Sequence, residues 1–392
     1  MKKYLFHLLL GLIVVIFSWN VISHKDDYLR RYDPNYWQAR YEESNWAKGW
    51  ESKELMGDAE LYATAGWRQI QGDDPTKINA EMPPFGKYLI GFSILIFQNQ
   101  NIQAIFFGIA LLAVIFLISK EILRDKVWAL VPVFFFSIEK LFLEDLATSM
   151  LDLPFTFFAC LALYSLIKSR QNPRWYLGTV VALTLVATTK MYLVGFALFG
   201  VVGLYLLFLF LIFRYRDIFW FLLFSPLFLV LYCSIYLIYF LNHHNLIDFK
   251  ELHFWIRHFA RVQMPGYPQF EIWRILLLGQ WHTWWGEGII RLKQWTPLWL
   301  ISFLSIFPTG WFIFKKGMKK NLSLLLLIAF PLSLLAMYSY GLPYPRYLMP
   351  VLPPLYILLC YNLRRAKISS FAYYAVTSFA YNFKLAFEKW KK

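Results

Sequence analysis

The chain has 392 residues, of which 59% are apolar and only 16% are charged, and its net charge is +15. A soluble domain is about half apolar and about a quarter charged, so this composition excludes an ordinary soluble enzyme. The positive charge does not indicate a nucleic-acid-binding protein either, because the Lys and Arg residues lie in short loops between apolar runs. The three cysteines lie within apolar runs and provide neither a disulfide framework nor the spacing of a zinc site.

Long apolar blocks predict helices that cross a membrane. About 20 helical residues cross the ~30 Å of hydrocarbon, and a backbone in lipid must form its hydrogen bonds within the segment. The first block is long enough to span and lacks a good cleavage site, so we expect a retained anchor rather than a signal peptide. We therefore predict an all-α fold, a polytopic transmembrane bundle of about 10–11 spans that forms a single domain, residues 1–392. The predicted spans are 4–22, 102–119, 127–139, 152–167, 175–189, 192–213, 218–241, 295–314, 321–339 and 346–363.

The placement of the apolar stretch 84–98 decides the topology. If it lies on the outer surface, the inner segments hold 21 Lys and Arg against 4 Asp and Glu, and the rest of the chain holds 18 against 20. If it spans, basic loops such as 315–320 are exported, against the positive-inside rule. We therefore predict an interfacial helix at 84–98, and two large outer segments at 23–101 and 242–294. The basic, aromatic tail 366–392 fits an interfacial helix on the inner surface.

The first outer segment contains a group of acidic and aromatic residues. Asp58 and Glu60 follow Gly57, and Tyr62 lies one helical turn after Asp58, on the same face of a helix. The spacing alone fits equally an acidic residue that caps the helix.

Two further outer pieces carry charges next to prolines. Glu81 and Lys87 flank a Pro-Pro pair at the predicted membrane surface, where a lysine can also simply snorkel. Asp152 lies at the mouth of an apolar helix, where a buried carboxylate is costly and is usually functional. The alternative for Asp152 is a helix cap with Pro154 in the first turn.

Two lone cations lie at outer helix ends. Lys190 is the only charge between Arg174 and Arg214, and Arg346, followed by Tyr347, opens the last predicted span. Either cation can bind a lipid phosphate, or it can mark a helix boundary or anchor a helix end.

The second large outer segment contains five of the seven histidines, but it lacks an HExxH motif, so we predict no metal site. Its stretch Gln280–Gly286 is aromatic and polar, as in an interfacial belt or in the wall of a sugar or lipid site. Carboxylates and cations from separate segments thus fall on one predicted membrane face.

This arrangement resembles the GT-C superfamily of integral-membrane glycosyltransferases, and most of all the branch of protein O-mannosyltransferases and the lipid A aminoarabinose transferase. The resemblance covers roughly residues 50–200 and the region near 346, whereas 218–340 is similar only in hydropathy. The motifs that carry it are Asp58-Ala-Glu60-Leu-Tyr62-Ala, Pro83-Pro84-Phe85-Gly86-Lys87-Tyr88-Leu89, Met150-Leu151-Asp152-Leu-Pro154, Thr189-Lys190 and Arg346-Tyr347-Leu-Met-Pro350.

Three positions depart from the family pattern. Ala59 separates the two acids that are adjacent in many relatives, Met82 stands where relatives tend to have a basic residue or histidine, and Thr148 stands where an arginine is often found. These departures put phosphate binding on Lys87, Lys190 and Arg346, or indicate weak or absent activity.

The resemblance implies an inverting transfer of a sugar from a polyprenyl-phosphate sugar to a hydroxyl of a protein, lipid or glycan. Asp58 would be the general base, with Glu60 and Asp152 as the other catalytic candidates. The expected substrate- and phosphate-binding residues are Glu81, Lys87, Lys190, Arg346, Tyr62 and Tyr347. No cofactor is required; a divalent cation is compatible with this chemistry, but no residue supports one. The protein is expected in the cell membrane, with its active site on the non-cytoplasmic side.

Two other functions fit the sequence. A transporter or lipid flippase would place charges in the middle of its spans and would break helices there, but few charges lie inside the predicted spans. An inactive relative that serves as a scaffold would account for the three departures.

Overall fold

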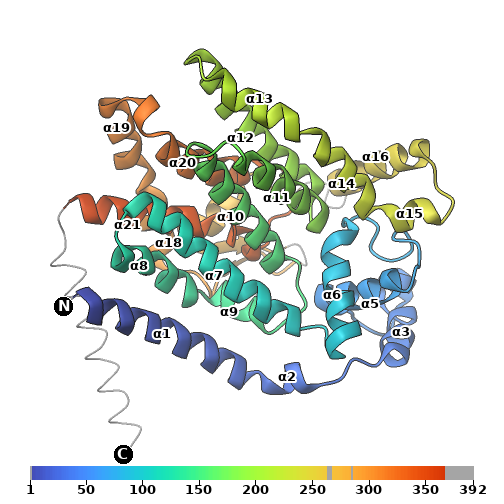
Figure 1. The fold of residues 1–392 in the computed structure, drawn as a ribbon. Helices are drawn as coiled ribbons and strands as arrows, with labels where there is room; N and C mark the ends of the chain where they lie inside the picture. Colours follow the sequence, from blue (N-terminus) through green and yellow to red (C-terminus); the bar gives the residue numbers. More distant parts are fainter. Residues whose placement is uncertain (1, 263–266, 284–285, 367–392) are drawn as a thin grey trace, which may run out of the picture.

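The computed structural model describes residues 2–262, 267–283 and 286–366 (Figure 1), with side chains left undescribed at 260–262. The predicted helix in the tail and the Trp284-Trp285 pair therefore lie outside the described residues. Within the described ranges the chain folds into helices and one small antiparallel sheet. This confirms the predicted all-α, polytopic bundle.

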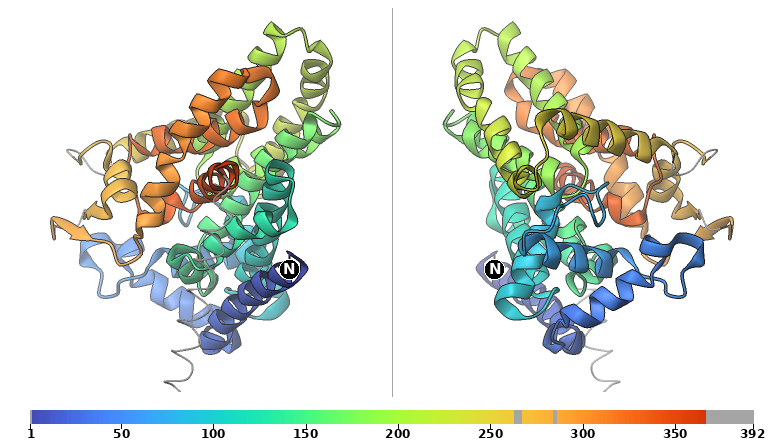
Figure 2. Two further views of the ribbon diagram at one scale, coloured as in Figure 1. Left: turned by 90° about the vertical axis from the view of Figure 1, so that its left-hand side faces the viewer. Right: turned by 90° about the vertical axis from the view of Figure 1, so that its right-hand side faces the viewer.

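The N-terminal quarter of the chain forms one long helix, α1, followed by shorter helices. Helix α1 lies along the outside of the bundle in every view (Figure 1, Figure 2). The elements of this part are α1 (Lys2–Ser23), α2 (Lys25–Leu29), α3 (Pro34–Glu42), α4 (Asn45–Lys48), η1 (Gly49–Glu51), α5 (Asp58–Ile70) and α6 (Pro84–Phe97).

The remaining elements form the bundle and the second outer segment. Several predicted spans are broken into shorter helices, for example at Ser225-Pro226. The bounds are α7 (Ile102–Leu123), α8 (Lys126–Ser137), α9 (Lys140–Leu146), α10 (Asp152–Ser169), α11 (Trp175–Thr189), α12 (Tyr192–Leu211), α13 (Tyr215–Phe224), α14 (Pro226–Ile235), α15 (Leu237–Leu241), α16 (Leu246–Val262), α17 (Glu271–Leu278), β1 (Gln280–His282), β2 (Ile289–Arg291), α18 (Pro297–Leu304), α19 (Ile306–Lys316), η2 (Met318–Lys320), α20 (Leu322–Tyr338), η3 (Pro345–Leu348) and α21 (Leu352–Arg365).

Six helical segments in the described ranges are long and apolar enough to cross a membrane. They are Lys3–Ser23, Ile102–Leu123, Asp152–Ser169, Tyr192–Leu211, Tyr215–Ile235 and Pro297–Lys316, and shorter apolar helices cover Pro84–Phe97, Lys126–Ser137, Trp175–Thr189 and Leu322–Tyr338. All but the last of the predicted spans correspond to one of these segments.

The predicted start of the last span, 346–363, is wrong: the helix begins later in the chain. The structure has a 3₁₀ turn at Pro345–Leu348, and the α-helix begins only at Leu352, with prolines in its first turn. Proline lacks the amide hydrogen of a helix interior, and its ring clashes with the preceding turn, so it is best accommodated in the first turn of a helix. Arg346 therefore lies on a turn in front of α21 rather than inside a span.

Helices α5 and α6 are joined by an unusually close backbone contact. A Cβ atom on Gly66 would lie 2.3 Å from the carbonyl oxygen of Lys87, and one on Gly91 would lie 2.3 Å from the carbonyl oxygen of Gly66. Any larger residue would force the helices apart, so glycine is required at both positions. In Figure 1, α6 runs across the direction of α1 and α7, as expected for a helix that lies in the interface; its side of the membrane stays a prediction.

Candidate active site

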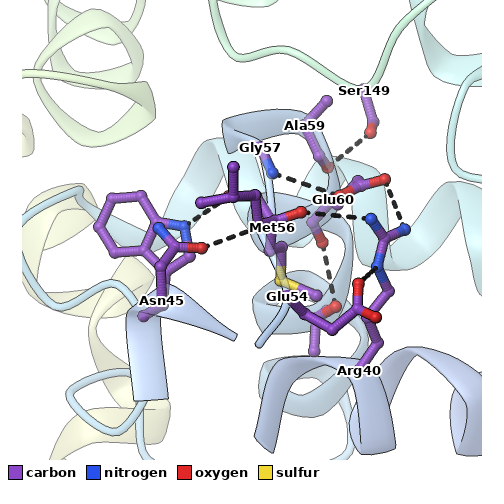
Figure 3. A network of polar contacts seen from close by, with 11 residues as sticks. Arg40, Asn45, Glu54, Met56, Gly57, Ala59, Glu60 and Ser149 are labelled. Atoms are coloured by element: carbon purple, nitrogen blue, oxygen red, sulfur yellow. Dashed lines mark hydrogen bonds and ion pairs between the residues drawn. The ribbon is translucent and has the colours of Figure 1, made fainter. Parts of the chain in front are cut away.

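Two neighbouring segments, α3 and the loop before α10, form hydrogen bonds to the first turn of α5 (Figure 3). Asp58 is the first residue of this helix. Glu60 accepts hydrogen bonds from the Gly57 amide at 3.2 Å and from Arg40 at 2.9 Å. Ser149, in the loop before α10, donates to the carbonyl oxygen of Ala59 at 2.8 Å. Glu60, a predicted catalytic residue, therefore faces Arg40 and anchors the helix start.

Four predicted site residues from distant segments form one chain of alternating charges. Arg346 donates through Nη2 to Asp58 Oδ2, and its Nε lies 3.4 Å from Asp152 Oδ2. The other Asp152 oxygen accepts from Lys190 Nζ. The sequence order is thus 58, 152, 190 and 346, whereas the spatial order is Asp58, Arg346, Asp152 and Lys190.

This charge chain runs from a partly open end to a buried end. The side chains of Asp58 and Arg346 are 28% and 21% exposed, but those of Asp152 and Lys190 are each only 3% exposed. An isolated buried charge costs several kcal/mol, so the inner pair must be neutralised within the protein. Lys190 also lies 4.4 Å from the ring centroid of Tyr347, a cation–π contact that adds to its stabilisation.

Asp145, a carboxylate to which the sequence assigned no role, lies near this chain. It is on the short helix α9 and is buried, and its Oδ2 atom has no hydrogen-bond partner among the described residues. Burial and then the charge of Asp152 raise the pKa of the Asp145 carboxyl well above its usual value, although Arg346 and Lys190 oppose the shift. No signal in the sequence indicated that Asp145 would be buried, because the residue lies in a short segment between two predicted spans.

A cavity of about 410 Å³ opens next to the partly exposed end of the charge chain. Asp58, Tyr62, Glu81, Arg346 and Tyr347 line it, and all five were predicted site residues. Its other walls are mostly apolar or aromatic, with Met191, Leu193, Ile256, Phe259, Met337 and Leu342 among the lining residues. A charged end and apolar walls fit an amphipathic ligand with an anionic group.

The other predicted residues do not line this cavity. Asp152 and Lys190 lie behind Arg346, which they contact directly or through each other. Lys87 is fully buried and donates to the carbonyl oxygens of Asn79 at 2.7 Å and Met82 at 2.8 Å, so it holds the backbone on either side of Glu81. Arg257, on α16, lines the cavity and was missed, because it looks like one charge on the polar face of an amphipathic helix.

A second cavity, of about 500 Å³, lies on the other side of Arg346 and Tyr344, which line both cavities. Helix α9 contributes Glu144 and Asp145, and the β1–β2 hairpin with the residues that follow it contributes Trp281 and residues 290–294. Trp281, in the aromatic stretch Gln280–Gly286, is thus a strand residue that lines this cavity. No group of three or more His, Cys, Asp and Glu side chains in the described ranges is arranged to hold a metal ion.

Comparisons with known proteins show what the sequence and the fold are similar to. The sequence model of the dolichyl-phosphate-mannose-protein mannosyltransferases matches residues 81–241. No curated protein sequence matches the chain.

Two solved structures share the fold. ArnT from Cupriavidus metallidurans bound to undecaprenyl phosphate is 15% identical, with a TM-score of 0.56 over 91% of this chain and 60% of that one. The Archaeoglobus fulgidus oligosaccharyltransferase in the apo form is 12% identical, with a TM-score of 0.56 over 95% of this chain and 52% of that one. The chain therefore spans little more than half the length of the structures that it matches.

The matched sequence region contains Glu81, Lys87, Asp152 and Lys190, and the shared fold extends over nearly the whole chain. Within the matched region, Asp152 and Lys190 form an ion pair in the structure. Residues 81–241 are thus similar to the dolichyl-phosphate-mannose-protein mannosyltransferases, and the chain shares its fold with ArnT and with the archaeal oligosaccharyltransferase.

Proposed function

We propose that the protein transfers a sugar, with inversion, from a polyprenyl-phosphate sugar to an acceptor hydroxyl on the non-cytoplasmic face of the cell membrane. The observation that carries this proposal is the cavity in which Arg346 and Asp58 meet at the charged end of largely apolar walls. The polyprenyl chain suits the apolar walls, and its phosphate suits the guanidinium, which binds phosphate oxygens in a bidentate manner. ArnT, which shares the fold, was solved with undecaprenyl phosphate.

Arg346 is the proposed phosphate ligand, and Asp152 and Lys190 are its positioning residues. Asp58 and Asp152 compensate the charge of Arg346 in the structure. A donor phosphate would compete with Asp58 for the guanidinium and would leave an Asp58 oxygen free. Lys190 would act indirectly: its charge neutralises Asp152, and the charge of Arg346 is then available to the phosphate.

Asp58 is the proposed general base. The acceptor oxygen forms a bond to the anomeric carbon while its proton passes to Asp58. The bond between the anomeric carbon and the phosphate oxygen breaks, and its electron pair leaves with the polyprenyl phosphate. The growing negative charge on this leaving group is stabilised by Arg346, a cation already held in place by the fold. Because attack and departure occur on opposite sides of the anomeric carbon, the configuration inverts.

The test is incubation of the purified full chain with radiolabelled polyprenyl-phosphate mannose, glucose or aminoarabinose, together with a crude membrane extract as the source of acceptor. We expect one donor to release polyprenyl phosphate and its label to appear in an acceptor. Arg346→Gln should weaken binding of that donor by about 1.5–3 kcal/mol, which is the size of a charged hydrogen bond. Arg68→Gln, which breaks the Arg68–Asp73 ion pair away from the cavity, should bind donor like the parent. If the parent transfers sugar and Arg346→Gln binds the donor as well as the parent does, Arg346 is not the phosphate ligand.

A further inference from the structure

A third cavity, of about 670 Å³, lies at the other end of helix α10 from the charge chain. Helix α10 begins at Asp152 and has 18 residues, which gives a length of about 27 Å. This length is close to the ~30 Å of hydrocarbon in a bilayer. The two polar regions therefore lie at opposite membrane surfaces, and the third cavity belongs to the face predicted to be cytoplasmic.

The third cavity is lined mainly by charged and polar side chains. Cations come from the α7–α8 turn, the end of α10 and the loop before α13, and Ser323 in the first turn of α20 completes the wall. The five cations are Lys120, Arg124, Lys126, Arg170 and Arg214, and the two acids are Glu121 and Asp125.

Both acids of this cavity have other hydrogen-bond donors. Glu121 accepts from Lys168 at 2.9 Å and from Gln171 at 2.8 Å. Asp125 caps α8 and accepts from the amide of Val127 at 2.9 Å. Among the described residues, Lys120, Arg124 and Lys126 form no salt bridge, so these three cations of the cavity are not paired with either of its two acids.

Arg170 gives an independent indication of a ligand. Its Nη1 donates to Ser323 Oγ at 3.2 Å, but its Nε atom is buried and has no hydrogen-bond partner among the described residues. A buried guanidinium nitrogen without a partner loses hydrogen bonds to water and gains none in return. The positive-inside rule accounts for basic loops in water, but it does not account for a buried, unpartnered N–H beside a cavity.

We propose that this cavity binds the phosphate of an anionic lipid headgroup in the leaflet opposite the proposed transferase site. Its volume lies within the range of about 300–1,000 Å³ typical of ligand sites. Several cations around one cavity are the arrangement that binds phosphate oxygens, and basic pockets between helices bind anionic headgroups. Leu211 and Phe213, just before Arg214, are exposed apolar side chains against which acyl chains can pack. This site does not depend on the proposed transferase activity.

The test uses the purified full chain in neutral detergent and native mass spectrometry with added dioleoyl phosphatidic acid or dioleoyl phosphatidylcholine. We expect the parent to retain phosphatidic acid in clear preference to phosphatidylcholine. Arg124→Gln/Lys126→Gln and Arg170→Gln should each lower this retention about tenfold or more, as expected for the loss of charge-assisted hydrogen bonds. Arg170→Lys, which keeps the charge, should restore part of it.

Lys319→Gln/Lys320→Gln is the matched control, because it removes two cations of the 315–320 loop, on the same predicted face, that do not line the cavity. It should retain phosphatidic acid like the parent. Arg124 and Lys126 are not buried, so their double variant remains informative even if Arg170→Gln does not fold. Inorganic phosphate forms a second arm: binding of free phosphate that depends on the same residues, with no lipid preference, would overturn the lipid assignment. Equal phosphatidic acid retention by the parent and both cavity variants would overturn the site.

Discussion

The two ends of helix α10 differ in how their charged side chains are paired. At the Asp152 end, charges of alternating sign contact one another and the innermost pair is almost fully buried. At the Arg170 end, cations from several loops share a cavity, and most of them form no salt bridge in the described part of the chain. The same apolar bundle separates the two ends.

The difference follows from the cost of removing charge from water. A buried ion must be paired, because its lost hydration is otherwise uncompensated, whereas solvated cations of the same sign repel one another only weakly. An anion can therefore bind at the Asp152 end only if it displaces a carboxylate, but at the Arg170 end it adds to an unbalanced set of cations. Displacement of a carboxylate by an anion is reversible and therefore suits the Asp152 end to a reaction cycle. Addition of an anion to unpaired cations suits the Arg170 end to stable lipid binding.

The largest expected effect is on catalysis at Asp58. Asp58→Asn keeps the shape of the side chain but removes proton acceptance, so we expect sugar transfer to fall by about 10²–10⁴-fold. Donor binding and thermal stability should persist, since the amide oxygen can still accept from Arg346. Single-turnover transfer of labelled sugar measures the effect.

The matched control for this variant is Asp73→Asn, which alters another Arg–Asp pair of the same outer segment, outside the cavity. It should transfer sugar at nearly the parental rate. Near-normal turnover in Asp58→Asn would eliminate this residue as the base and would leave Asp145 or Asp152 as the carboxylate to test.

The second expected effect is on stability and compares the two ends directly. Lys190→Met leaves the buried carboxylate of Asp152 without its closest partner and should cost about 3–5 kcal/mol of unfolding free energy. Lys168→Met breaks the partly exposed Lys168–Glu121 pair at the other end and should cost about 0–1 kcal/mol. Unfolding by detergent titration measures both. Adding Asp152→Asn to Lys190→Met should recover most of the loss, and equal costs for the two single variants would show that burial does not distinguish the ends.

The smallest expected effect concerns Asp145 and pH. Burial raises the pKa of this carboxyl in the folded protein, so its charge opposes folding, and the penalty is absent below the unfolded pKa near 3.9 and grows as pH rises toward the folded pKa. Relative to the parent, Asp145→Asn should therefore gain thermal stability as pH increases from about 4 to 8. A constant difference for Asp145→Asn would mean that Arg346 and Lys190 fully offset the burial.

The sequence predicted the helical bundle and most of its segments because lipid imposes a simple length rule on apolar runs. It also identified Asp58, Asp152, Lys190 and Arg346 as candidate site residues, since they are charges at helix ends in an otherwise apolar chain. The start of the last helix was missed because a proline-rich stretch can begin a helix at more than one position.

The pairing within the site could not be predicted from the sequence. Asp58 and Arg346 are separated by 288 positions, and nothing local specifies that they form an ion pair. Glu60 and Lys87 look equivalent to the cavity residues in sequence, yet one faces Arg40 and the other faces backbone carbonyls. Asp145 lacked any sequence signal because its burial depends on how α9 packs against the bundle. These features arise from tertiary packing, which sets burial and partners together.

The most direct test of the account is whether the two ends of α10 face opposite sides of the membrane. In a background in which Cys160, Cys233 and Cys360 are replaced by Ser, a single Gln98→Cys variant and a single Lys319→Cys variant are treated in intact cells with a membrane-impermeant maleimide. Both positions are exposed. We expect Gln98→Cys to react in intact cells and Lys319→Cys to react only after permeabilisation. The reverse pattern, or reaction of both in intact cells, would contradict the assignment of the charge chain to the non-cytoplasmic face.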